Sequence, residues 1–69
     1  MSAIVDGQRV SIGDYVNFKC DIEQGGTIIN IKQDRMGRKF LVLASECGFE
    51  GGYIGGETTH TELAEDCWL

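Results

Sequence analysis

The 69 residues form one domain at most, spanning residues 1–69, and a chain of this length buries only a modest hydrophobic core. The net charge is −5, so long-range repulsion from a phosphate backbone disfavours non-specific nucleic-acid binding. No apolar run approaches the roughly 20 residues that a membrane-spanning helix needs, which argues against a membrane protein of that class.

The charges are unevenly distributed along the chain. Residues 1–40 contain all six basic side chains and five acidic ones, a net charge of +1. Residues 41–69 contain six acidic side chains and no Lys or Arg, a net charge of −6, and the two parts add up to −5. An acidic half of this kind suits a basic surface on a protein partner. The alternative is that the acidic residues only keep a small domain soluble.

The N-terminal segment contains a turn signal between two short apolar stretches. Ile4-Val5 and residues 10–12 flank Asp6-Gly7, a dipeptide that favours tight hairpin turns. We therefore expect two short strands here, followed by a second turn at Gly13-Asp14.

The next stretch alternates between apolar and polar residues, which is typical of a half-buried strand. One predicted face carries Val16, Phe18, Cys20 and Ile22, and the other carries Tyr15, Asn17, Lys19 and Asp21. Gln24-Gly25-Gly26 interrupts this pattern and predicts a turn. Residues 27–31, T-I-I-N-I, are rich in β-branched side chains and predict the returning strand.

This predicted hairpin resembles the KOW-type motif of small SH3-like barrels. The resemblance implies an all-β fold, either an SH3-like barrel or a strongly curled antiparallel sheet of about five strands. Because such barrels bind RNA, ribosomes, peptides or other proteins, the resemblance implies no single function.

The overall pattern also resembles small uncharacterised proteins of large tailed bacteriophages and their hosts. The similar stretches are GDYVNFKCDIEQGGTI, GFEGGY and EDCW. This resemblance implies a protein of the bacterial cytoplasm. The role that it suggests is to bind and modulate or inhibit a host protein, such as a defence or nucleic-acid-processing factor.

Residues 32–39 are polar, contain Gly37 and predict the loop of a second hairpin. Arg35, Arg38 and Lys39 make this loop the one basic spot of the sequence. Together with the outward-facing Tyr15 they form the alternative hypothesis, a KOW-like RNA- or DNA-binding site. The simpler interpretation is a solvated turn whose charges discourage edge pairing.

Residues 40–44 are apolar on both faces of the predicted strand. Either the chain covers both faces itself, or Leu41 and Leu43 belong to an interface with a second copy. Trp68 would close one end of the barrel or, if exposed, anchor such an interface. We therefore expect a homodimer through Leu41, Leu43 and Trp68.

Five glycines lie between residues 48 and 56, in a pattern that matches no phosphate-binding motif. Phe49 and Tyr53 are either apolar plugs or the lip of a binding site. Thr59 and Glu62 have capping-box spacing and predict one short helical turn near the C-terminus. The residues expected to bind a basic protein surface are Phe49, Glu50, Tyr53, Glu57, Glu62, Glu65 and Asp66.

Candidate catalytic and metal-binding residues are few. Cys20, Cys47, His60 and Cys67 are widely spaced, whereas structural zinc sites use closely paired ligands. No motif fixes a nucleophile beside His60, the only histidine. Nothing at the N-terminus resembles a secretory signal, so we expect free thiols in a reducing cytoplasm. The sequence thus predicts a non-enzymatic protein-binding module without a metal or cofactor.

Overall fold

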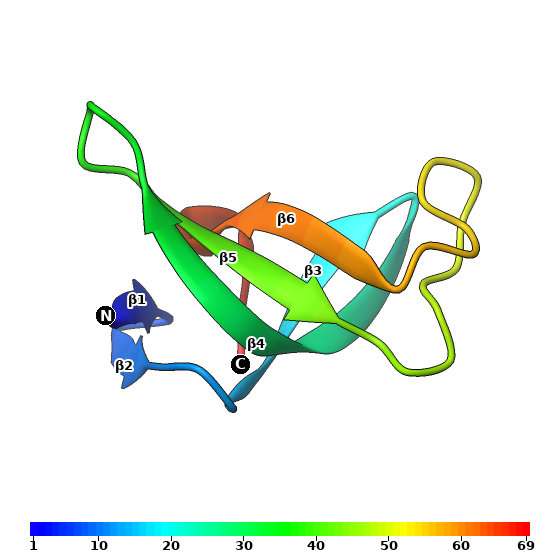
Figure 1. Cartoon of the computed structure of the whole chain (residues 1–69), viewed down its shortest axis with the longest axis horizontal. Helices are drawn as coiled ribbons and strands as arrows, with labels where there is room; N and C mark the ends of the chain where they lie inside the picture. The colour runs from blue at the N-terminus through cyan, green and yellow to red at the C-terminus, as the bar shows by residue number, and fades with distance from the viewer.

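The computed structural model describes residues 1–69 and shows an all-β chain whose six strands form two antiparallel sheets (Figure 1). The first sheet consists of β1 (Ala3–Val5) and β2 (Gln8–Val10). The second contains, in spatial order, β3 (Tyr15–Cys20), β4 (Ile22–Gln33), β5 (Lys39–Ala44) and β6 (Thr59–Leu63). A 3-10 turn, η1 (Ala64–Asp66), follows β6 and is too short to span a membrane. The predicted all-β class is confirmed, with one strand more than the sequence predicts.

The N-terminal hairpin turns at Asp6-Gly7, as predicted from the sequence. Val5 pairs with Gln8, and the two turn residues have φ angles of 52° and 75°. Two successive positive φ angles match the right-handed twist of the flanking strands, and this is why Asp-Gly is favoured there. The Asp6 side chain also accepts a hydrogen bond of 2.8 Å from the backbone N–H of Leu69, so the C-terminus is fastened to this turn.

The predicted turn at Gly25-Gly26 is wrong. The chain reverses at Asp21, which has a φ of 71°, and Cys20 is the register partner of Ile22. Both glycines lie inside β4, and Gly25 is covered by the Tyr15 ring, since a Cβ there would lie 2.6 Å from Tyr15 Cε1. These glycines therefore leave room for neighbouring side chains instead of making a turn.

The early reversal at Asp21 and an irregularity in β4 set which apolar residues are buried. Val16 and Phe18 are fully buried as predicted, but Ile22 lies beyond the reversal and is exposed. The register of β4 with β5 shifts between Ile28 and Asn30, which is the signature of a β-bulge. The bulge turns both Ile28 and Ile31 toward the core, although strict alternation would place them on opposite faces.

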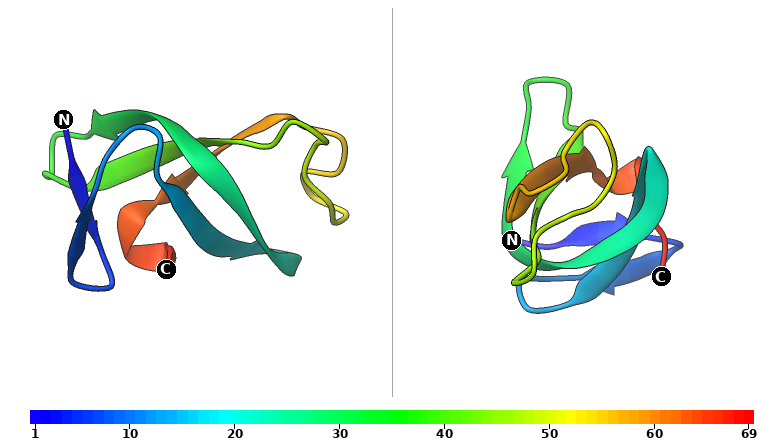
Figure 2. Two further views of the ribbon diagram at one scale, coloured as in Figure 1. Left: turned by 90° about the horizontal axis from the view of Figure 1, so that it is seen from below. Right: turned by 90° about the vertical axis from the view of Figure 1, so that its right-hand side faces the viewer.

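The two sheets share one hydrophobic core. Figure 2 shows the N-terminal hairpin at one end of the four-stranded sheet, and its inward residues Ala3, Val5 and Val10 join the buried cluster. Leu41 and Leu43 of β5 are fully buried in this cluster. The sequence left two interpretations of residues 40–44: burial by the chain itself or an interface with a second copy. For Leu41 and Leu43 the first is correct, because the chain itself buries both side chains.

The helical turn near the C-terminus exists, but the capping-box interpretation is wrong. Thr59 and Glu62 lie in β6, where they pair with Ala44 and Leu41 of β5. Pairing with the neighbouring strand overrides the local helix signal, and the 3-10 turn begins after it, at Ala64. Beyond η1, Trp68 exchanges two backbone hydrogen bonds with Asn17 of β3, of 2.7 and 2.9 Å.

Candidate functional site

The connection between β5 and β6 is a loop of residues 45–58, named here the acidic loop, which backbone hydrogen bonds close on itself. Ser45 N–H donates to the carbonyl oxygen of Thr58 at 3.0 Å, which closes the base of the loop. Phe49 N–H donates to Glu57 O at 2.7 Å, and Gly56 N–H donates to Phe49 O at 3.0 Å. The glycine-rich stretch is thus folded into defined turns.

Side chains of the β3–β4 hairpin hold the acidic loop from outside. The Gln24 side-chain amide donates to Glu50 O at 2.8 Å, and its oxygen accepts from Glu50 N–H at 2.9 Å. The carboxylate of Asp21 accepts a hydrogen bond of 2.6 Å from Gly52 N–H. Three side chain–backbone bonds across more than twenty residues of sequence fix the loop relative to the sheet.

Phe49 fastens the acidic loop from inside. Its side chain is only 3% exposed, and its ring packs edge-on against Phe18 with centroids 5.4 Å apart. Gly26 makes this possible, because a Cβ at that position would lie 3.2 Å from Phe49 Cζ. Phe49 is therefore a core residue, and its predicted role as part of the exposed binding surface is wrong. The other sequence interpretation, an apolar plug, describes it correctly.

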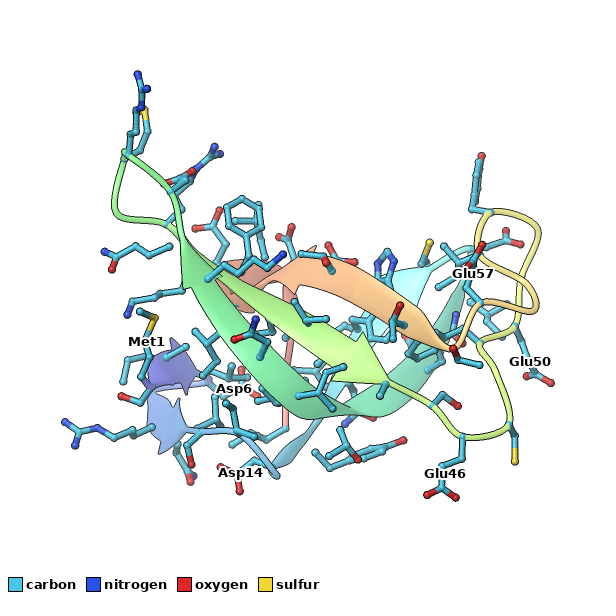
Figure 3. The ribbon with its side chains drawn as sticks, viewed as in Figure 1. Met1, Asp6, Asp14, Glu46, Glu50 and Glu57 are labelled. Carbon is cyan, nitrogen blue, oxygen red and sulfur yellow. The ribbon has the colours of Figure 1, made fainter.

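Tyr53 differs sharply from Phe49, four residues away. It is 83% exposed, the largest exposed fraction among the large apolar and aromatic side chains of the chain. Figure 3 shows Glu46, Glu50 and Glu57 around the same end of the molecule, and all three are exposed. The acidic loop thus carries one exposed aromatic side chain and three exposed carboxylates.

The remaining predicted partner residues lie elsewhere, on β6 and η1. Glu62 is half-buried, and its Oε2 lies 3.0 Å from Nε2 of His60, whose ring stacks on Phe18. Glu65 and Asp66 are exposed on η1. The acidic residues of the C-terminal half therefore form two groups and not the single surface expected from their closeness in sequence.

The cysteines and the histidine do not assemble into a site. Nowhere in the chain do three or more His, Cys, Asp or Glu side chains converge as metal ligands. The three cysteines are free, and Cys67 is buried, with its thiol donating to Leu63 O at 3.3 Å. Burial, followed by the nearby charges of Glu62 and Asp66, raises the pKa of the Cys67 thiol to about 12. This thiol therefore stays protonated and is a poor nucleophile.

The residues of the alternative nucleic-acid site are separated. Tyr15 pairs with Thr27 near the start of the β4–β5 ladder, whereas Arg35 and Arg38 lie at its far end, beyond the Gln33–Lys39 pair. Six residues of strand separate Thr27 from Gln33, a distance of roughly 20 Å. The Arg38 guanidinium contacts the Asp34 carboxylate at 2.8 Å, and Lys39 Nζ donates to Ser2 O at 3.2 Å.

The predicted interface residues also have other roles. Leu41 and Leu43 are buried and unavailable to a second copy. Trp68 is half-buried, and its backbone is paired with Asn17. Self-association stays a prediction, and these leucines cannot carry it without unfolding.

Sequence reasoning missed Asp21, Gln24 and Gly26, the residues that position the acidic loop. Each acts on a segment more than twenty residues away, and no local pattern marks such a contact.

When the chain is compared with known proteins, no family model, no curated protein and no solved structure matches it.

Proposed function

We propose that this chain is a non-enzymatic protein-binding module that uses the acidic loop to contact a basic surface on a partner. The observation that carries the proposal is the exposure of Tyr53. Its side chain is 83% exposed, although hydrogen bonds from Gln24 and Asp21 anchor the loop that carries it. A large side chain left in water by a well-anchored loop is typical of an interface anchor.

The loop's anchoring would reduce the entropic cost of binding. A flexible loop must be ordered when a complex forms, which offsets part of the interaction free energy. Here the bonds from Gln24 and Asp21 already fix the backbone on both sides of residue 51. Binding would then mainly bury Tyr53, while Glu46, Glu50 and Glu57 steer a basic partner toward it.

We also propose that the fold is a variant of the SH3-like barrel. Three features support this: the antiparallel strand order β3-β4-β5-β6, the 3-10 turn after β6, and the backbone pairing of Trp68 with β3. If the resemblance to phage proteins holds, the partner is a protein of the host cell whose activity the module modulates or inhibits.

A comparative capture experiment tests the proposed function. The full chain, Tyr53→Ala and Ile12→Ala are immobilised and exposed to bacterial lysate at low and at high salt. Ile12 is 59% exposed and lies outside the acidic loop, so Ile12→Ala controls for the loss of any exposed apolar side chain.

The proposal expects a protein with a basic surface that wild type and Ile12→Ala retain, that Tyr53→Ala loses, and that high salt releases. Retention of the same proteins by all three chains contradicts it. Capture of RNA or DNA that depends on Arg35 and Arg38 would instead favour the nucleic-acid alternative.

A further inference from the structure

A second potential binding site lies at the end of the molecule opposite the acidic loop. The N-terminal hairpin, the turn between β4 and β5, and η1 surround a groove of about 550 Å³, named here the basic groove. Figure 1 shows the hairpin and this turn at one end of the sheet and the acidic loop at the other. The volume falls within the range of ligand-binding clefts, roughly 300–1,000 Å³.

The walls of the basic groove combine positive charge with exposed apolar surface. Arg9, Arg38 and Lys39 line it, which is half of the chain's six basic residues, against the single acid Glu65. Ile4 and Met36 also line it and are 58% and 82% exposed. An unbranched Met side chain adapts its shape to varied apolar partners, so Met36 suits a peptide-binding surface.

The positive groups retain free hydrogen-bond donors. The Arg9 side chain makes no hydrogen bond or ion pair within the chain, and Arg9 is exposed. Arg38 donates to Asp34 only through Nε, and its guanidinium also lies over the Phe40 ring, 5.7 Å from the centroid. Its side chain is 53% exposed, and its terminal nitrogens make no hydrogen bond within the chain. Lys39 donates one hydrogen bond, to Ser2 O, which leaves further donors on its ammonium group.

We propose that the basic groove binds a short, extended, acidic segment of a protein, with carboxylates on Arg9 and Arg38 and an apolar side chain against Ile4 and Met36. Paired guanidinium–carboxylate contacts give both affinity and orientation. This site goes beyond the function proposed above, because it lies at the other end of the molecule. Its ligand is acidic, whereas the acidic loop is proposed to bind a basic surface. The module would then join a basic surface to an acidic segment.

The composition of the groove favours a peptide over a nucleic acid. Single-stranded nucleic acids bind through aromatic side chains on which the bases stack. No Phe, Tyr or Trp lines the basic groove, so it offers no side chain on which bases could stack. The exposed Ile4 and Met36 instead match aliphatic side chains of a peptide.

The test is a titration of the 15N-labelled full chain with a capped Glu-Leu-Glu-Glu-Leu-Glu peptide, followed by NMR amide shifts. The shifts should concentrate at Ile4, Arg9, Met36 and Arg38, and a peptide with Ser in place of Leu should bind more weakly. Arg9→Glu should lower the affinity about tenfold, because it replaces attraction by repulsion. Arg35→Glu is the matched control, since Arg35 is exposed on the same β4–β5 turn but outside the groove.

Several outcomes would overturn the proposal. These are an absence of groove shifts, equal losses from Arg9→Glu and Arg35→Glu, or tighter binding of oligouridine in the same groove. Concentration-dependent shifts in the groove and the acidic loop without peptide would mean that a second copy is the occupant. Because Tyr53 lies at the other end, Tyr53→Ala should leave the peptide affinity unchanged, so this test and that of the proposed function fail independently.

Discussion

The two long connections of the four-stranded sheet are held in opposite ways. The turn between β4 and β5 is held by hydrogen bonds within the turn itself. The Asp34 carboxylate accepts them from Met36 N–H, Arg38 N–H and Arg38 Nε. The acidic loop between β5 and β6 has backbone hydrogen bonds of its own, but it is also held by Gln24 and Asp21, which are 26 and 31 residues from their partners. The first connection depends on five consecutive residues, 34–38, whereas the second also depends on side chains from a distant hairpin.

This difference predicts how each connection responds to change. A turn stabilised within itself should survive damage elsewhere in the chain. A loop held by distant residues should loosen whenever those residues are altered, even where its own sequence is untouched. The predictions below test this contrast, from the largest expected effect to the smallest.

Phe49→Ala should have the largest effect. It removes a buried ring that packs on Phe18 and fastens the acidic loop to the core, so the free energy of unfolding should fall by about 3–5 kcal/mol. Urea denaturation measures the change. Met36→Ala is the control in the other connection, where the side chain is 82% exposed and the change should be close to zero. Equal losses would contradict the contrast.

Gly26→Ala should destabilise the chain by about 1–3 kcal/mol through overpacking. The new Cβ would lie 3.0 Å from Ala44 O and 3.1 Å from Leu43 Cβ, in addition to its contact with Phe49. Gly52→Ala is the matched control, since Gly52 has no positive φ and its Cβ would lie 3.5 Å from Asp21 Oδ2, an ordinary contact distance. Thermal unfolding should show the greater loss for Gly26→Ala, and the reverse order would refute a packing role for Gly26.

Gln24→Ala should cost about 1–3 kcal/mol, because two hydrogen bonds to Glu50 are lost. Amide hydrogen exchange should quicken at Glu50 and its neighbours and stay unchanged in the 34–38 turn. Gln33→Ala is the control, since Gln33 makes only a bond of 3.4 Å to Gly37 O. Exchange that quickens equally in both connections would show that the loop is not held separately by Gln24.

The smallest effect concerns pH. Desolvation would raise the pKa of Asp34, but the hydrogen bonds and the charge of Arg38, with the N–H of Met36, hold that pKa below its ordinary value. The carboxylate therefore stabilises the fold at pH values above its unfolded pKa. This contribution is lost as the pH falls through the lowered folded value.

An NMR titration of the Asp34 carboxyl measures the shift directly. Asp34→Asn should weaken the acid dependence of the 34–38 turn and leave the acidic loop unaffected. A normal pKa for Asp34 would contradict the account of the turn.

The same contrast explains how much could be predicted from the sequence. The sequence predicts the Asp6-Gly7 turn and the burial of Val16 and Phe18 correctly, because each depends on adjacent residues. It also predicts a turn within residues 32–39, although strand pairing extends to Gln33 and Lys39 and leaves only residues 34–38 as the turn. The sequence wrongly predicts a turn at Gly25-Gly26, because no neighbouring residue reveals the Tyr15 and Phe49 rings that require glycine there.

For the candidate site, the sequence predicted Tyr53, Glu50 and Glu57 but could not distinguish Phe49 from Tyr53. Both are aromatic residues among glycines. Only the position of the loop over Phe18 makes Phe49 a core residue and leaves Tyr53 on the surface. Sequence proximity groups Glu62 with the loop, yet Glu62 lies in β6 opposite Leu41 and is half-buried beside His60.

The most direct test of the central claim is the backbone order of the acidic loop, measured by 15N relaxation at the hydrogen-bonded amides of Glu50, Gly52 and Gly56. An anchored loop that presents Tyr53 in one arrangement predicts order parameters near those of the strands, about 0.85. Values below about 0.6 at these amides would show a flexible loop and contradict the account.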